Sequence, residues 1–187
     1  MTNCFSRGGD KNEVVVNAAD TALTTALESL ARRMDIDSFQ AVDCLQHGDH
    51  NAWSSFYYDL SKQIAGQIGN LNEDVKAAYI DEYDVVPEDS FFGETARTTV
   101  ICLIVWVQHK TDMLMNSLVV LLDQALVQKF NDLIGKPRLT HLLEVQIFDD
   151  ADAKNPTGYG AWLTSDYFYL TKVWRRKGVK LELYQSQ

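Results

Sequence analysis

The sequence predicts an α+β protein, in which an N-terminal layer of about three helices packs on a mostly antiparallel sheet with one β-α-β crossover and a C-terminal hairpin. Apolar residues recur at helical spacing in the first third of the chain, and strand-like apolar runs follow. One long helical pattern also lies between two strand patterns, as in a crossover connection. We expect a flexible tail, residues 1–17, before a single domain, residues 18–187. Its helical part spans 18–69 and its sheet part spans 73–187.

Three amphipathic helices are expected in the helical part. We place the N-cap of the first at Asp20 and that of the second at Asp37, because aspartate accepts hydrogen bonds from the free amides of a first turn. The second helix directs Phe39 inward and ends at Gly48, a residue that tolerates the left-handed conformation of a helix terminator. The third helix has the most regular apolar stripe, which consists of Trp53, Phe56, Tyr57, Leu60, Ile64 and Ile68.

Strand patterns begin after the third helix. Residues 75–84 fit a strand or a helix, and we choose a strand because the aromatic residues follow a turn. A loop is expected over 85–96. Residues 98–107 are rich in β-branched residues and apolar on both faces, which is typical of a central strand, with a buried helix as the alternative. A helix over 112–134 and a strand over 141–148 then form the crossover.

The C-terminal segment predicts a short helix over 160–167 and an edge hairpin. If Lys177 and Gly178 form a two-residue turn, Trp174 faces Leu181 across the ribbon. One face of that ribbon is then mostly apolar and the other polar, as expected of an edge.

Acidic residues are concentrated in the first half of the chain. The 26 Asp and Glu against 17 Lys and Arg give a net charge of −9. Residues 1–94 carry 17 acids and 6 bases, a net of −11, whereas residues 95–187 carry 9 acids and 11 bases, a net of +2. An acidic surface repels phosphates and attracts basic partners, so the balance disfavours nucleic acid. Without a signal peptide or an apolar run of membrane length, we expect a cytoplasmic protein with no membrane contact.

The charge pattern motivates the leading hypothesis, a non-enzymatic cytoplasmic protein-interaction or regulatory protein that uses an acidic surface and no cofactor. The expected partner-binding residues are Asp81, Glu82, Asp84, Glu88 and Asp89 together with Trp174, Arg175 and Arg176. The partner is another protein or a second copy of the chain, because pairing of the acidic segment with the basic one would suit a homodimer.

The competing hypothesis is a small divalent-metal-dependent enzyme acting on a phosphate ester or nucleotide. The crossover brings the carboxyl ends of two strands to one edge, which places His109 near Asp149, Asp150 and Asp152. Carboxylate oxygens there could bind Mg²⁺, Mn²⁺ or Ca²⁺, with Mg²⁺ or Mn²⁺ as the cofactor of phosphate chemistry. The alternative, which we favour, is a solvated turn, since aspartate is common in turns.

Other chemical signatures are missing from the sequence. It contains no Gly-x-Ser-x-Gly elbow, no phosphate-binding loop and no pair of closely spaced cysteines. A small-molecule pocket between helices and sheet, lined by Trp53, Tyr57 and Trp106, is a third possibility, although these residues also suit an ordinary core.

Overall fold

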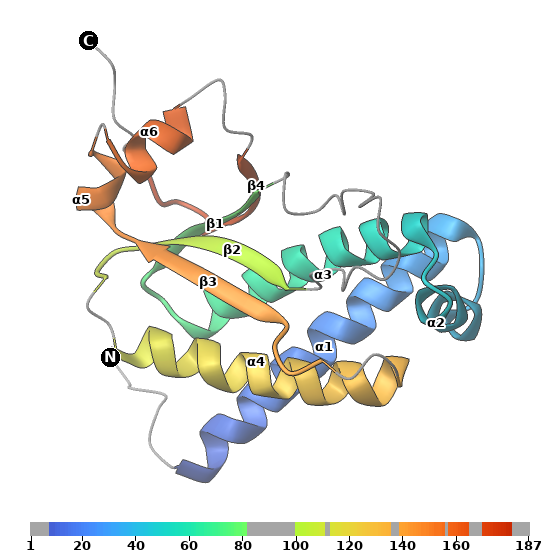
Figure 1. Ribbon diagram of the computed structural model, residues 1–187. Helices are drawn as coiled ribbons and strands as arrows, with labels where there is room; N and C mark the ends of the chain where they lie inside the picture. The colour runs from blue at the N-terminus through green and yellow to red at the C-terminus, as the bar shows by residue number, and fades with distance from the viewer. Residues whose placement is uncertain are drawn as a thin grey trace.

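The computed structural model describes residues 8–81, 100–110, 113–135, 139–155, 157–164 and 170–180. Within these ranges the chain forms, in order, α1 (Gly8–Met34), α2 (Ser38–Gln46), α3 (His50–Leu71), β1 (Val75–Asp81), β2 (Ile101–Val107), α4 (Met113–Ile134), β3 (Leu143–Phe148), α5 (Asp150–Ala153), α6 (Tyr159–Thr164) and β4 (Leu170–Arg175). Figure 1 shows helices packed on a single sheet, which confirms the α+β class.

The four strands of this sheet follow the order β3-β2-β1-β4. Strand β1 pairs antiparallel with both β2 and β4, whereas β2 and β3 are parallel and are joined through α4. The mostly antiparallel sheet and its one crossover are therefore confirmed. In the part that the structure describes, both ambiguous segments form strands, and every residue of β2 except Cys102 is buried, as expected of a central strand.

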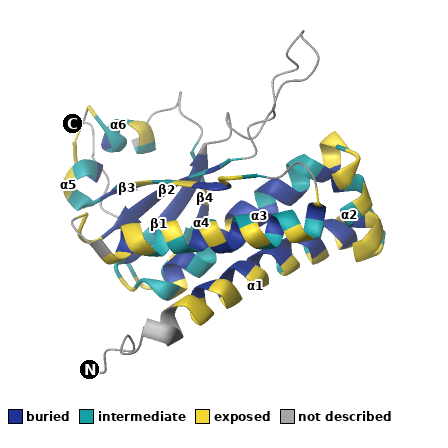
Figure 2. Cartoon of the chain, turned by 60° about the horizontal axis from the view of Figure 1, so that its bottom comes forward, coloured by how far each residue is buried: buried dark blue, intermediate teal, exposed yellow. Residues whose placement is uncertain are grey.

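Helices α1, α3 and α4 lie on one side of the sheet, which we call the inner face, and α5 and α6 lie on the opposite side, the outer face (Figure 1). The inner face holds the larger core, and the buried residues in Figure 2 are concentrated on the strands and on the sides of the helices that face them. Trp53, Phe56 and Phe130 form its aromatic centre, with ring centroids 5.9 to 6.4 Å apart. The outer core is smaller and comprises Ala77, Tyr79, Ile104, Trp106, Phe148 and Ala153.

The predicted start of the first helix is wrong. Helix α1 begins at Gly8, so residues 8–17, expected in a flexible tail, are helical. The apolar stripe continues toward the N-terminus through Val15 and Ala19, which are buried, and this burial favours the longer helix. Asp20 is not an N-cap; its carboxylate instead forms an ion pair with Lys129 of α4, 2.8 Å away.

The ends of α2 follow the predicted chemistry, but its buried side does not. Asp37 caps α2 in a capping box with Gln40, and Gly48 after the helix has a φ of +74°. Phe39, however, is 82% exposed, because Ala41 and Leu45 form the buried side of this short helix. The prediction that Phe39 faces inward is therefore wrong.

The last predicted elements are confirmed in part. Helix α6 is present, and Lys177 and Gly178 form a turn in which Gly178 has a φ of +80°. Residues 181–187, the expected return strand of the hairpin, and the loop over 85–96 lie outside the described residues. Among the described strands, β4 lies at one edge of the sheet, next to β1. Among the described helices, none combines the length and apolar character needed to cross a membrane.

Candidate functional site

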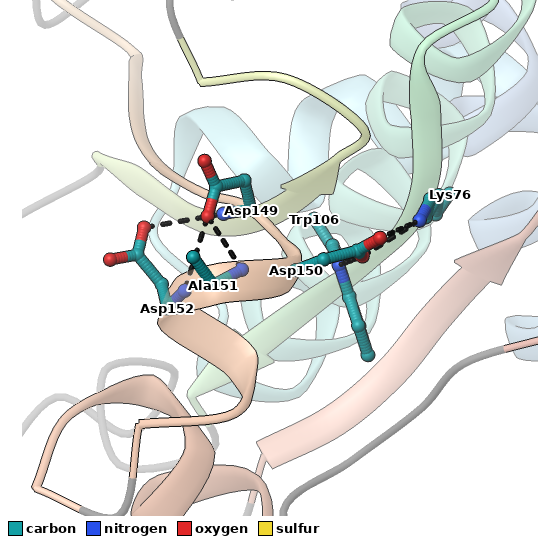
Figure 3. Close-up of polar contacts among 6 residues, drawn as sticks. All are labelled: Lys76, Trp106, Asp149, Asp150, Ala151 and Asp152. Carbon is teal, nitrogen blue, oxygen red and sulfur yellow. Dashed lines mark hydrogen bonds and ion pairs between the residues drawn. The ribbon is translucent and has the colours of Figure 1, made fainter.

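A β-bulge directs Lys76 to the outer face of the sheet. Val75 lies opposite Val107 and Ala77 lies opposite Trp106, so Lys76 is the extra residue on β1. Its ammonium group lies 2.7 and 2.6 Å from the two carboxylate oxygens of Asp150 at the start of α5 (Figure 3). The indole Nε1 of Trp106 donates a third hydrogen bond to Asp150, at 2.8 Å.

These contacts keep the Asp150 carboxyl ionised. Burial alone would raise its pKa, but the hydrogen bonds from Lys76 and Trp106 and the charge of Lys76 outweigh burial and lower the pKa below its ordinary value. The side chain of Lys76 is only 15% exposed, whereas that of Asp150 is 45% exposed. The pair therefore joins β1 to α5 by a charged contact that is shielded on the lysine side.

The other two aspartates of the predicted metal site form a capping box around α5. Asp149 accepts hydrogen bonds from the amides of Ala151 and Asp152, and Asp152 accepts one from the amide of Asp149 (Figure 3). Asp152 also binds the ammonium group of Lys110 at 3.0 Å. The segment is thus a helical turn held by its own carboxylates, where a solvated turn or a metal site was expected.

A row of aromatic rings continues this layer along the outer face. Phe148 lies between Trp106 and Tyr159, with ring centroids 5.3 and 4.9 Å away, and Trp162 meets the edge of Tyr159 at 5.4 Å. Gly160 permits the close approach of α5 and α6, because a Cβ there would lie 2.4 Å from a backbone oxygen of Ala153. The outer layer is thus fastened by ring contacts and by the Asp150 pair.

The metal prediction gains no support from this geometry. The expected edge forms, since Asp149 follows β3 and His109 follows β2, but it is Lys110 that contacts Asp152. All three carboxylates are engaged by protein donors. Across the part of the chain that the structure describes, no group of three or more His, Cys, Asp or Glu could hold a metal ion.

The predicted basic partner site is built into the fold. The guanidinium group of Arg176 donates to the backbone oxygens of Gly69, Asn72 and Val75, and so ties β4 to the α3–β1 connection. It also lies 5.4 Å from the ring of Trp174, which packs on α3.

The remaining predicted partner-binding residues have a mixed outcome. Arg175 is exposed and donates to the backbone oxygen of Val179 at 2.8 Å. The side chain of Asp81 is outside the described part of the chain, as are Glu82, Asp84, Glu88 and Asp89.

The pocket hypothesis is wrong, because the three aromatic residues lie on opposite sides of the sheet. Trp53 and Tyr57 belong to the inner core, where the Trp53 indole donates to the backbone oxygen of Leu45. Trp106 belongs to the outer core.

Tyr79 is another buried residue of this outer core. Burial raises the pKa of Tyr79 to about 12, although the positive charge of Arg175 acts to lower it. Tyr79 is therefore a neutral phenol at physiological pH.

The structure reveals an acidic surface that the sequence reasoning missed, which we call the α2 tip. It consists of Phe39 and four exposed aspartates, Asp35, Asp37, Asp43 and Asp49. No Lys or Arg occurs between Arg33 and Lys62. A helical projection of α2 from Ala41 and Leu45 would have placed Phe39 on the outer side, next to Asp43.

Comparisons with known proteins return no match: no family model, no curated protein and no solved structure resembles the chain.

Proposed function

We propose that this chain is a non-enzymatic cytoplasmic interaction or regulatory protein that binds a basic partner protein through an acidic surface. The observation that carries the proposal is the α2 tip, where Phe39 is 82% exposed among four exposed aspartates. Exposed aromatic rings are the side chains that most often anchor protein interfaces. The surrounding charges would speed association with a basic surface and favour it over acidic ones.

The position of the tip supports this role. Helix α2 lies at the end of the helical layer remote from α5 and α6 (Figure 1). Two of the aspartates also cap helices, since Asp37 binds the amide of Gln40 and Asp49 that of Ala52. Their carboxylates are thereby fixed in place, one at the start of α2 and the other at the start of α3, so that a partner would meet a preorganised surface.

The proposal can be tested with a synthetic amphipathic peptide that carries lysines on one face and leucines on the other. Fluorescence anisotropy of the labelled peptide would measure its affinity for the full chain at low and at physiological salt. We expect salt-dependent binding that Phe39→Ser and Asp43→Asn together weaken about tenfold. Val14→Ser, which removes an exposed apolar side chain from α1, is the control.

Two outcomes would overturn the proposal. One is equal affinity of the wild type and the double variant for the peptide. The other is a rise in the unfolding temperature with Mg²⁺ or Mn²⁺ that Asp152→Ala abolishes, which would favour the metal-dependent enzyme. A native-state site saturated at 100 times its Kd adds about 2.7 kcal/mol to the free energy of unfolding, so such a rise would be measurable.

A further inference from the structure

Among the described strands, β3 forms the edge of the sheet opposite β4 (Figure 1). Its pairing with β2 is parallel, and the oxygen of Leu142 accepts from the first residue of β2, so that every second residue of β3 is bonded to β2. The residues between them direct their backbone groups away from the sheet. The amide of Leu143 shows this alternation, because it donates to Asp123 of α4 and not to β2. Val145 and Ile147 follow at the same two-residue spacing.

The outward backbone groups of Val145 and Ile147 form an open pairing edge. Among the described residues, none bonds these two amides or their two carbonyl oxygens. Folded proteins usually block such an edge with a lysine, a proline or a bulge. Strand β3, with the sequence Leu-Glu-Val-Gln-Ile-Phe, contains neither of these residues, and its register on β2 is regular. The edge can therefore accept another strand.

The open backbone groups of β3 match those of a second copy of the same strand. In an antiparallel pair centred on Gln146, Val145 lies opposite Ile147 of the other copy, and the two residues exchange both backbone hydrogen bonds. Every open amide and oxygen of Val145 and Ile147 is then paired. A pair centred on Val145 is less favourable, because it sets Ile147 against Leu143, whose amide is already held by Asp123.

The side chains on both faces of β3 suit the same pairing. On the inner face, Val145 and Ile147 are half-buried at the margin of the core, and each would cover the other across the joint. On the outer face, the side-chain oxygen of Gln146 accepts from Tyr159 at 3.0 Å, which leaves its amino group to donate to Gln146 of the other copy. Glu144, the one charged residue of the strand, would lie about 14 Å along the strand from its own copy. The chain thus supplies its own matching strand.

We infer that β3 is the interface for a second copy of this chain, which adds its own β3 antiparallel across a two-fold axis at Gln146 and makes one continuous sheet of the two. The inference goes beyond the proposed function, because it uses the sheet edge and not the α2 tip. The net charge of −9 on each copy opposes association, so added salt should strengthen the dimer, whereas salt weakens peptide binding at the tip. Failure of one proposal is therefore distinguishable from failure of the other.

Sedimentation equilibrium of the full chain tests the dimer. We expect a monomer–dimer equilibrium at micromolar concentrations, since one strand pair buries less than a standard interface. Val145→Pro removes an outward amide but no bond to β2, and Val145→Lys gives the edge the lysine that blocks strand addition. Each should weaken the dimer about 100-fold and leave the circular dichroism of the monomer unchanged. Val14→Lys, at an exposed valine of α1, is the control.

Disulfide formation tests the register. In the inferred pair, the Cα atoms of the two Gln146 residues lie about 4.5 Å apart, which is within the reach of a disulfide. Gln146→Cys should therefore give a covalent dimer under mild oxidation. Its yield should exceed that of the wild type, which carries the native cysteines, and that of Val14→Cys treated in the same way.

Three results would overturn the inference. A wild-type chain that stays monomeric at about 100 μM has no such interface, and the edge is then left to a strand of another protein. A dimer that neither Val145 variant weakens, or that Val14→Lys weakens as much, uses another surface. A yield of covalent dimer from Gln146→Cys no higher than that of the controls would exclude the antiparallel register.

Discussion

The two faces of the sheet are held by different kinds of interaction. The inner face packs against three long helices through aliphatic and aromatic side chains, most of them fully buried. The outer face carries two helices of four and six residues. These are fastened by a row of rings, a capping box and the Lys76–Asp150–Trp106 contacts. Non-directional burial thus dominates one face, and directed polar contacts dominate the other.

This difference bears on function. A helix of four residues has too few backbone hydrogen bonds to persist alone, so α5 depends on its contacts with the sheet. The carboxylates that suggested a metal site are therefore the groups that hold the outer layer in place. Substitution there should loosen α5 and α6 locally, whereas substitution in the inner core should lower the stability of the whole domain.

The largest effect is expected in the inner core. Phe56→Ala removes a ring that is 1% exposed and contacts Trp53 and Phe130, which should lower the free energy of unfolding by about 3–5 kcal/mol. The matched outer variant, Tyr159→Ala, removes a half-buried ring stacked on Phe148 and should cost about 1–2 kcal/mol. Urea unfolding followed by circular dichroism measures both. Equal losses would contradict the distinction between the faces.

A smaller effect, with a change of sign, is expected where α3 meets β4. A Cβ added at Gly69 would lie 2.3 Å from the ring of Trp174, whereas one at Gly66 would lie 3.7 Å away. Both residues are within α3, where alanine is favoured over glycine by up to about 1 kcal/mol. Gly66→Ala should therefore raise the unfolding temperature. Gly69→Ala should lower stability by about 1–2 kcal/mol, because Trp174 must shift against Arg176.

Thermal unfolding of the two glycine variants provides the measurement, and each is the control of the other. A Gly69→Ala protein as stable as Gly66→Ala would show that Trp174 moves at little cost. In that case the edge of the inner face would be as adaptable as the outer layer.

The inner face could be predicted from the sequence because its signal is periodic. The stripe of α3, from Trp53 to Ile68, and the apolar run of β2 each indicate both the element and its buried side. The start of α1 was missed because Asp20 is a good N-cap in isolation, and only its ion pair with Lys129 shows its use. Phe39 was missed because α2 is too short for its stripe to be distinct.

For the outer face, the sequence predicts where the aspartates lie but not what they bind. The crossover brings Asp149, Asp150 and Asp152 to one edge, as the sequence predicts. The donor that engages Asp150 is Lys76, 74 positions away along the chain, and it reaches the carboxylate through a bulge in β1. A bulge has no sequence pattern of its own, so the same aspartates were consistent with a turn, a metal site or an ion pair.

An effect of similar size tests the ion pair of the outer face through its pH dependence. Asp150→Asn keeps the shape of the side chain but leaves the ammonium of Lys76 without a counter-charge, which should cost about 1–2 kcal/mol at neutral pH. Because folding lowers the pKa of Asp150, the ionised carboxylate stabilises the protein above the pKa of the unfolded chain. That contribution is lost as the pH falls through the folded pKa, so the gap between wild type and variant should close below about pH 4.

Urea unfolding at a series of pH values, followed by the fluorescence of Trp106 and its neighbours, measures this gap. Asp20→Asn, which removes the exposed partner of Lys129, is the control and should cost less than about 1 kcal/mol. A gap of constant size from neutral to acid pH would mean that Asp150 acts through packing alone. The outer layer would then be held as the inner face is, by burial, and its aspartates would again be open to a role in binding.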